Sequence, residues 1–176
     1  MYYDEPPLSF LQIPGAKEVG IEFHSCSKTY NMTGWRVGWV CGNGDAVKIL
    51  GRLKDNYDSG VFQAVQEAAV AALSGPQDCV ADMRQIYRER RDLFVPKLRA
   101  LGWNVINPPA TFYVWAHTPA GYTSAQTAER LLNEAHIVCT PGNGFGPSGE
   151  GYVRFALTVP TQRLQTALDR IGRMKW

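Results

Sequence analysis

The strongest constraint on the fold is a pattern in the second half of the chain, where amphipathic helical stretches alternate with short apolar strands. The first helical stretch begins near Gln77 and ends at Gly102, a residue type suited to the position after a helix. Its apolar residues recur at helical spacing: Val80, Met83, Tyr87, Phe94, Leu98 and Leu101. Alternation of this kind is typical of a compact layer of helices on a sheet. The sequence therefore predicts an α/β fold, with a mixed α+β domain in this half.

Four short strands and two further helices complete the expected second half. The strands are expected at residues 103–106, 111–116, 137–139 and 152–157, and the helices are expected to be capped by Ser124 and Thr161. The glycine-rich residues 141–151 predict a turn-rich loop. Pro96 lies inside the long helical stretch, so we expect it to kink or interrupt that helix.

The first half of the chain carries only two strands and two helices. After a loop of about a dozen residues, the expected elements are a strand at 19–24, a loop at 25–34, a strand at 35–41 and helices at 45–57 and 61–73. Because two strands make a poor core, this half resembles part of a larger sheet domain. Ser74-Gly75-Pro76 is the expected boundary. We therefore divide the chain into residues 1–75 and residues 76–176.

The composition excludes several classes of protein. Of the 176 residues, 45% are hydrophobic and 19% are charged, which excludes an intrinsically disordered chain. The net charge of +2 is too small to indicate binding to nucleic acid or to an anionic membrane, and no apolar stretch reaches the ~18 residues of a membrane span. The four cysteines and three histidines are scattered, so no metal site is expected. The first residues do not resemble a signal peptide, so we expect a cytoplasmic protein.

Lys28 is the strongest catalytic candidate. It lies in a loop of small residues directly after an expected strand, which can present its amine to a pocket. A lysine with a lowered pKa can form a Schiff base with a carbonyl, and pyridoxal 5'-phosphate is the commonest partner for that chemistry. Ser25 and Ser27 supply hydroxyls, Arg36 supplies a guanidinium suited to a phosphate, and Tyr30 is a further candidate pocket residue. On residue types alone, a solvated surface lysine is the commoner outcome.

Arg154 is the second candidate. It lies on the face of the strand expected at 152–157 that is opposite the apolar Phe155. A surface arginine on the solvent side fits this position equally well. The functional alternative is a substrate contact, because a guanidinium fork fixes the orientation of a carboxylate. Of the aromatic residues before this strand, Phe112 and Tyr113 are expected to serve in packing.

Two motifs point to other chemistry and carry less weight. Ser25 and Lys28 match the S-x-x-K pattern of serine β-lactamases and penicillin-binding proteins, but the S-D-N and K-T-G motifs of those enzymes are absent. Gly144, Gly146 and Gly149 match the spacing of a dinucleotide-binding fingerprint, but a strand and not a helix is expected after them. The glycines are therefore better explained by a turn-rich loop.

Taken together, residues 25–38 carry a much stronger signal than Lys28 alone. Their sequence, S-C-S-K-T-Y-N-M-T-G-W-R-V-G, resembles the lysine motif of fold-type I, class I and II aminotransferases, which depend on pyridoxal phosphate. The resemblance implies that Lys28 holds the cofactor covalently and moves the α-proton of the substrate. It also implies that Ser25 and Arg36 bind the phosphate, with Ser27 as a further phosphate contact.

The resemblance extends over the full chain. The segment 141–154 is similar to the aminotransferase segment whose arginine grips the substrate α-carboxylate, which implies that role for Arg154. Residues 19–25 (V-G-I-E-F-H-S) and 58–63 (D-S-G-V-F-Q) look most like the LL-diaminopimelate aminotransferases. The implied substrates are LL-2,6-diaminopimelate and 2-oxoglutarate, as in lysine biosynthesis. An aspartate-type or aromatic aminotransferase of the same family is the alternative.

Complete members of this family have a longer N-terminal portion, so the chain resembles their C-terminal half. Residues 1–75 would be a remnant of the large cofactor-binding domain, and residues 76–176 the small domain. Because the groups that hold the pyridine ring have no match, we expect negligible transaminase activity from the isolated chain. Unpaired sheet edges predict self-association, and the family implies a homodimer. A non-catalytic structural or interaction remnant is the alternative from another class.

Overall fold

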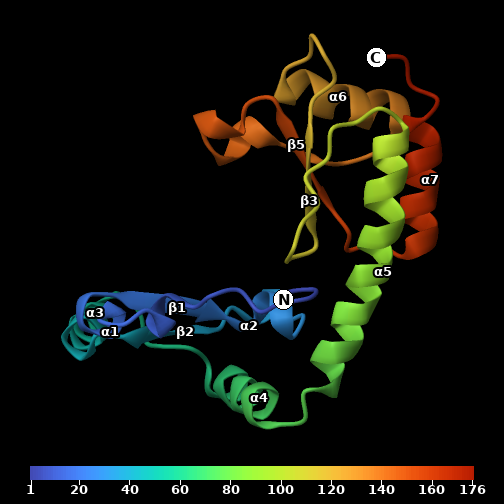
Figure 1. Cartoon of the computed structure of the whole chain (residues 1–176). Coiled ribbons are helices and arrows are strands. Elements are labelled where there is room, and N and C mark those ends of the chain that lie inside the picture. Colours follow the sequence, from blue (N-terminus) through green and yellow to red (C-terminus); the bar gives the residue numbers. More distant parts are fainter. The chain divides into compact units, whose positions relative to one another are not determined.

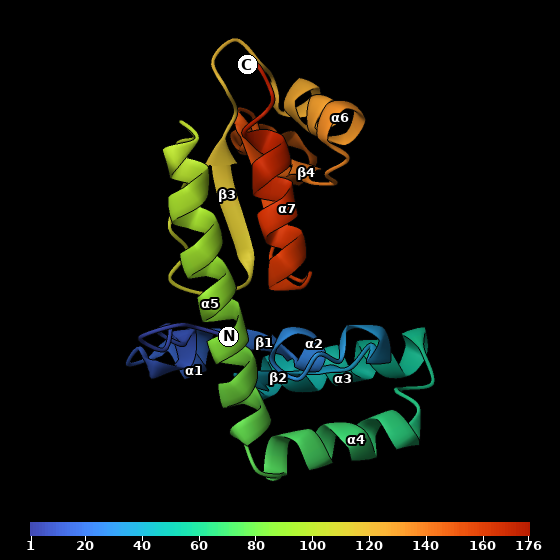
Figure 2. The same ribbon diagram turned by 90° about the vertical axis from the view of Figure 1, so that its right-hand side faces the viewer.

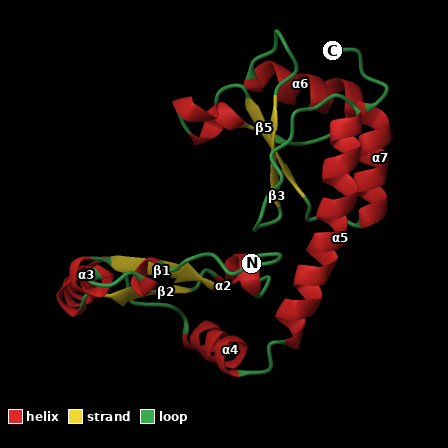
Figure 3. Ribbon diagram, in the orientation of Figure 1, coloured by secondary structure: helices red, strands yellow, loops and turns green.

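The computed structural model describes all residues from Met1 to Trp176 and shows two compact units in the chain (Figure 1). The N-terminal unit comprises Pro6–Met83 together with Met1, and the C-terminal unit comprises Arg84–Trp176 together with Tyr2–Glu5. Both units combine helices with strands (Figure 3), so the expected α/β class is confirmed. No helix has both the length and the apolar character that crossing a membrane requires.

The N-terminal unit contains two antiparallel strands, β1 (Ile21–Ser25) and β2 (Gly38–Gly42). The register of this pair places Ser25 opposite Gly38. Its helices and short 3-10 turns are, in chain order, η1 (Phe10–Gln12), α1 (Ala16–Val19), α2 (Cys26–Thr29), η2 (Thr33–Trp35), α3 (Gly44–Tyr57) and α4 (Gln63–Ser74). Because β1 and β2 pair at the point where the intervening segment leaves and returns, that segment forms a closed loop.

The C-terminal unit contains a three-stranded antiparallel sheet in the order β3-β5-β4. Helices α5 and α7 lie side by side over one face of this sheet (Figures 1 and 2), and the ring centroids of Phe94 and Phe155 are 5.4 Å apart in the core beneath them. The elements are α5 (Asp78–Ala100), whose first turn and a half belongs to the N-terminal unit, β3 (Tyr113–His117), α6 (Ser124–Ala135), β4 (Thr140–Pro141), η3 (Gly142–Phe145), η4 (Pro147–Gly149), β5 (Tyr152–Ala156) and α7 (Thr161–Ile171).

The first residues of the chain pack into the C-terminal unit, where the sequence predicts only a loop. Tyr3 is completely buried, and its hydroxyl donates a hydrogen bond to the Thr111 carbonyl over 2.6 Å. The guanidinium of Arg91 lies 4.1 Å from the centre of the Tyr3 ring. Burial raises the pKa of the Tyr3 phenol to about 12. Tyr3 is therefore part of the core of this unit.

Helix α5 continues through Pro96, where the sequence predicts a kink or a break. Proline lacks a backbone N–H, so the Asp92 carbonyl loses its helical partner. Both residues lie on the exposed side of the helix, where water can solvate that carbonyl. Phe94 and Leu98 on the other side are buried. The expected interruption does not occur, because packing of the buried side outweighs the local cost of the proline.

Two expected strands also differ from the structure. Residues 103–106 form only one β-bridge, between Val105 and Ala116. Their alternate apolar side chains, Trp103 and Val105, are buried although no continuous β-ladder forms. Residues 137–139 are not a strand, and the short ladder forms at the following β4. Helix starts also shift, since the cap of α6 is Thr123 and not Ser124. The alternating pattern therefore reports burial more directly than it reports strand pairing.

Candidate active site

The candidate lysine lies on a helical turn, and not in the irregular loop expected from the sequence. Helix α2 begins directly after β1, and Ser25 caps it: the Ser25 hydroxyl accepts a hydrogen bond from the Ser27 N–H over 3.1 Å and donates to the Ser27 hydroxyl over 2.9 Å. Serine favours this position because its side chain replaces a missing backbone partner. Cys26 is buried and Lys28 is exposed, so the turn presents the lysine at the surface.

A chain of hydrogen bonds joins Arg36 to the two serines. The Arg36 guanidinium donates to the Thr33 carbonyl over 3.0 Å, and the Thr33 hydroxyl donates to the Ser27 carbonyl over 3.0 Å. The pairing of β1 with β2 closes the loop on either side of these bonds. The structure therefore brings Ser25, Ser27, Lys28 and Arg36 together in one loop.

The backbone of this loop is strained at two residues. Asn31 and Arg36 have left-handed conformations, with φ of 55° and 56°. Asparagine tolerates this region, but an arginine rarely adopts it, and such positions cost on the order of 1–3 kcal/mol. Residues held in uncommon backbone conformations cluster at ligand-binding sites. The conformation of Arg36 therefore supports a binding role for its side chain.

A small apolar cluster holds the lysine turn in place. Cys26 and Met32 from the loop are buried against Ala69 of α4. The ring of Tyr30 packs against the same cluster, and its hydroxyl donates to the side chain of Gln77 over 2.9 Å. In this structure, Tyr30 therefore contributes packing and one hydrogen bond to the loop.

The donors in this loop fit the phosphate of pyridoxal phosphate. Two serine hydroxyls lie next to each other, and the N–H groups of Arg36 that do not reach Thr33 donate to no acceptor in the protein. A phosphate dianion needs several donors of this kind, including a positive charge. Lys28 adds an amine, the group that an aldehyde requires, on the same turn.

Arg154 belongs to the C-terminal unit and lies between two aromatic rings. Its guanidinium carbon is 4.0 Å from the ring centre of Tyr113 and 4.2 Å from that of Phe145. Phe155 and the other apolar neighbour on β5 are buried on the opposite face, so the expected alternation is confirmed. Stacking fixes the plane of the guanidinium, and its N–H groups donate to no acceptor in the protein. This arrangement leaves the fork available for a carboxylate.

The two rings around Arg154 were not expected to have a role in the site. Tyr113 was expected to serve only in packing, as the buried Phe112 does. Alternation along β3 places Tyr113 and Trp115 on one face, but only the β3–β5 register of the structure, with Trp115 opposite Arg154, brings that face beside the arginine. Phe145 lies in the glycine-rich loop, and no periodic pattern in the sequence indicates its contact with Arg154.

The loop that carries Phe145 is anchored to the start of α6. The completely buried Ser124 hydroxyl accepts hydrogen bonds from the N–H groups of Gly151 over 2.9 Å and of Tyr152 over 3.1 Å. The Glu150 carboxylate accepts from the N–H groups of Ser124 over 2.8 Å and of Gly151 over 3.1 Å. These hydrogen bonds hold the pKa of Glu150 below its usual value of 4.5. The bond from the Ser124 N–H has the largest effect on this pKa.

This lowered pKa predicts a contribution of Glu150 to acid stability. A carboxylate whose pKa is lowered by folding stabilises the fold above its unfolded pKa, and that contribution is lost as the pH falls through the folded value. Between pH 7 and pH 3.5, urea unfolding midpoints of the parent should therefore fall further than those of Glu150→Gln. Glu129→Gln, which removes an exposed carboxylate without a hydrogen bond, should behave like the parent. Equal acid sensitivity of Glu150→Gln and the parent would contradict the assignment.

Residues 8–171 match the family model for aminotransferase class I and II. The LL-diaminopimelate aminotransferase of Moorella thermoacetica is 58% identical over 166 residues, which are 94% of this chain and 43% of that protein. Two solved structures match closely: substrate-bound BacF from Bacillus subtilis (TM-score 0.94, 38% identity, 99% of this chain and 45% of that one) and an aromatic aminotransferase from Pyrococcus horikoshii OT3 (TM-score 0.92, 31% identity, 98% and 47%).

The chain thus spans less than half the length of these relatives. The matched region nevertheless includes both the lysine turn and Arg154, and it covers most of the chain. Members of the matched family are transferases that generally depend on pyridoxal phosphate. The chain belongs to the aminotransferase class I and II family.

Proposed function

We propose that this chain carries the cofactor lysine of a pyridoxal-phosphate-dependent aminotransferase, Lys28. The observation that carries the proposal is the closed loop in which hydrogen bonds connect Ser25, Ser27 and Arg36 around the turn that bears Lys28. Membership of the aminotransferase family supports it, because the matched residues include the whole loop.

In this proposal the residues of the loop have separate tasks. The Ser25 and Ser27 hydroxyls and the Arg36 guanidinium bind the phosphate, because together they supply several donors and a positive charge. The Lys28 amine would hold the aldehyde of the cofactor, and as a free base it would take the proton from the substrate α-carbon. Pyridoxal phosphate, when bound, supplies an electron sink for the carbon that loses this proton.

Arg154 has the task of orienting the substrate. Its fork binds the two oxygens of the α-carboxylate, and the rings of Tyr113 and Phe145 restrict rotation of the guanidinium. Orientation matters because it decides which bond at the α-carbon is weakened. A lysine in place of Arg154 would keep the charge but lose the fork and the stacking, so it is not a conservative replacement.

The proposed substrates are LL-2,6-diaminopimelate as amino donor and 2-oxoglutarate as acceptor. This choice rests on identity to a relative named for that activity, which at 58% is well above the 31% to the aromatic aminotransferase of known structure. The fold does not separate the two, because an aromatic aminotransferase matches it with a TM-score of 0.92. Sequence identity is therefore the evidence that favours diaminopimelate.

We further propose that residues 1–75, apart from the segment Tyr2–Glu5 that packs into the C-terminal unit, belong to a larger cofactor-binding domain, and that residues 76–176 form the small domain. Large apolar side chains are exposed on the N-terminal unit, with Phe23 at 68%, Leu53 at 65% and Tyr57 at 86% exposure. These three side chains line one apolar depression of this unit, and contiguous apolar surface of this kind favours association. A homodimer, or self-association of the chain, is the arrangement that covers it.

The covalent link to Lys28 is the most direct test of this function. The chain is incubated with pyridoxal phosphate, reduced with borohydride and digested, and the modified lysines are identified by mass spectrometry. We expect the modification to be at Lys28 and the visible absorbance band of the unreduced sample to be lost in Lys28→Ala. The trapping needs no turnover, so it tests the site even though we expect negligible glutamate-dependent transamination from the chain alone.

The control is Lys48→Ala, which removes an exposed lysine of α3 in the same unit. This variant should keep both the absorbance band and the modification at Lys28. Arg36→Gln should weaken the band at a fixed cofactor concentration, because one phosphate donor is lost. Modification spread equally over surface lysines, with no difference between Lys28→Ala and Lys48→Ala, would contradict the proposal.

A further inference from the structure

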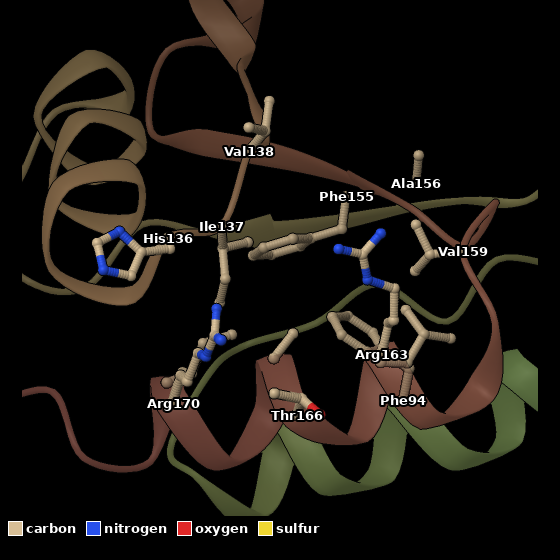
Figure 4. A pocket seen from close by; sticks show the side chains of 13 residues that line it. Phe94, His136, Ile137, Val138, Phe155, Ala156, Val159, Arg163, Thr166 and Arg170 are labelled. Atoms are coloured by element: carbon tan, nitrogen blue, oxygen red, sulfur yellow. The ribbon is translucent and has the colours of Figure 1, made fainter.

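A cavity of about 360 Å³ lies within the C-terminal unit (Figure 4). It is bounded by α7, by the segment that follows α6 and by the end of β5. Phe155 on β5 lines it, and Arg154 on the same strand points to the opposite face of the sheet. The cavity is therefore separated by the sheet from the proposed carboxylate contact of the active site.

The lining of this cavity has basic side chains and no acidic ones. The basic side chains are Arg163 and Arg170 of α7 and His136 at the end of α6. The guanidinium groups of Arg163 and Arg170 extend from α7 into the cavity (Figure 4). Two arginines that face one space without an acidic partner leave an uncompensated positive field there.

The two guanidinium groups also retain donors for a ligand. Arg170 donates one hydrogen bond, to the Ala135 carbonyl over 3.2 Å, which anchors its side chain at the wall of the cavity. The side chain of Arg163 makes no hydrogen bond or ion pair with the protein. A planar fork with free N–H groups is suited to carboxylate oxygens.

The remaining walls are mostly apolar. Phe94 and Phe155 are buried at the base, and Ile137 and Val159 line the sides, as Figure 4 shows. A ligand that only matched the charge would leave these walls in contact with water. Apolar surface buried against them contributes roughly 25 cal/mol per Å². The lining therefore favours a molecule with an anionic end and an apolar body.

We propose that this cavity binds a small organic acid, with its carboxylate on the Arg163 fork, in the positive field of Arg170, and its apolar body against Phe94, Phe155 and Ile137. The site is independent of the lysine turn and of Arg154. Its volume is sufficient for a ligand with a single aromatic ring or an equivalent branched aliphatic chain.

The test uses three probes that separate charge from apolar contact. These are 3-phenylpropionate, its uncharged analogue 3-phenylpropanol, and sulfate, which has charge and no apolar body. Each is titrated into the isotope-labelled 176-residue chain, and methyl signals of Ile137 and Val159 report binding at the cavity. We expect saturable shifts with 3-phenylpropionate and at least about tenfold weaker binding of the other two probes.

Substitutions identify the side chains that bind the carboxylate. Arg163→Gln should weaken binding of 3-phenylpropionate about tenfold, as expected for loss of a charge-assisted contact, and Arg170→Gln should weaken it by a smaller factor, through loss of its positive field. Arg173→Gln removes the same charge three residues beyond Arg170, at a position that does not line the cavity, and should change binding less than about twofold.

Three results would overturn the proposal. Equal binding of 3-phenylpropanol would show that the arginines do not select the ligand. An equal effect of Arg173→Gln would indicate general electrostatic attraction in place of a site. Shifts centred on Phe145 and Tyr113, without shifts at Ile137, would show that the acid binds at Arg154 instead.

Discussion

Replacing Tyr3 by alanine is expected to lower the unfolding free energy of the C-terminal unit by about 3–5 kcal/mol. Tyr3 is completely buried, although it is the third residue of the chain and lies far in sequence from its neighbours. Removing the ring leaves a cavity under Arg91 and removes the hydrogen bond to the Thr111 carbonyl. Since a domain is stable by only about 5–15 kcal/mol, the unit would lose a large part of its stability.

Two control variants separate the contributions to this effect. Tyr3→Phe removes only the hydroxyl, and because Thr111 is exposed, water can replace the lost partner. We therefore expect it to cost about 0.5–1.5 kcal/mol. Tyr57→Ala makes the same truncation as Tyr3→Ala at a side chain that is 86% exposed, and it should cost less than about 0.5 kcal/mol.

Hydrogen exchange across a urea series is the suitable measurement, because it reports the two units separately. Peptides from β5 and α7 should lose protection in Tyr3→Ala, and peptides from β1 and β2 should not. A loss in Tyr3→Ala as small as that in Tyr57→Ala would show that the segment Tyr2–Glu5 is not part of the core of the unit.

Tyr3 also illustrates what could not be predicted from the sequence. The helices of the second half follow from hydrophobic periodicity, although α7 is capped by Pro160 and begins at Thr161, the residue expected as its cap. Periodicity is a local signal, and the first residues contain no repeat from which a partner can be inferred. The contact of Tyr3 with Thr111 joins segments 108 residues apart, so only the folded structure shows it.

The candidate site was predicted to a different extent in its two parts. Lys28, Ser25, Ser27 and Arg36 came from one contiguous motif, and the structure places them in one loop. The helical turn itself was missed because four residues are too few to show a helical repeat, whereas the cap by Ser25 is a local rule that was available. Whether these residues bind the cofactor stays a prediction.

The residues around Arg154 could not be predicted from the sequence, because they come from other segments of the chain. Alternation along β5 predicted its face correctly, since alternation is a property of a single strand. The rings beside it come from β3 and from the glycine-rich loop, and the conformation of that loop depends on close backbone contacts that side-chain patterns do not show. A close backbone contact between two of its glycines, Gly142 and Gly149, holds the loop in this conformation.

Replacing Gly142 by alanine is the second large effect expected, with a loss of about 2–4 kcal/mol of stability. Gly142 is buried, and a Cβ atom there would collide with the Gly149 carbonyl and come within 2.8 Å of the Tyr152 carbonyl oxygen. These are backbone atoms, so no side-chain rotation relieves the contact. The N–H group of Tyr152 is bonded to the buried Ser124 hydroxyl, which prevents the loop from simply moving away.

Gly144→Ala is the matched control in the same loop. No atom lies within 4 Å of a Cβ built at Gly144, and its backbone is not in the left-handed region. This variant should leave stability unchanged or raise it by about 0.4–1 kcal/mol, because alanine lowers the entropy of the unfolded chain. The difference between the two variants isolates the backbone contact from the general effect of replacing a glycine.

The same pair of variants tests whether the loop positions Arg154. Phe145 follows Gly142 by three residues, and its ring lies 4.2 Å from the Arg154 guanidinium carbon. Ring currents from Phe145 and Tyr113 should displace the Nε–H signal of Arg154 in NMR spectra, and this displacement should decrease in Gly142→Ala but not in Gly144→Ala. If Gly142→Ala lost stability while the Arg154 signal stayed unchanged, the close glycine contact would stabilise the fold without fixing the arginine. The stacking by Tyr113 alone would then be sufficient to hold the fork.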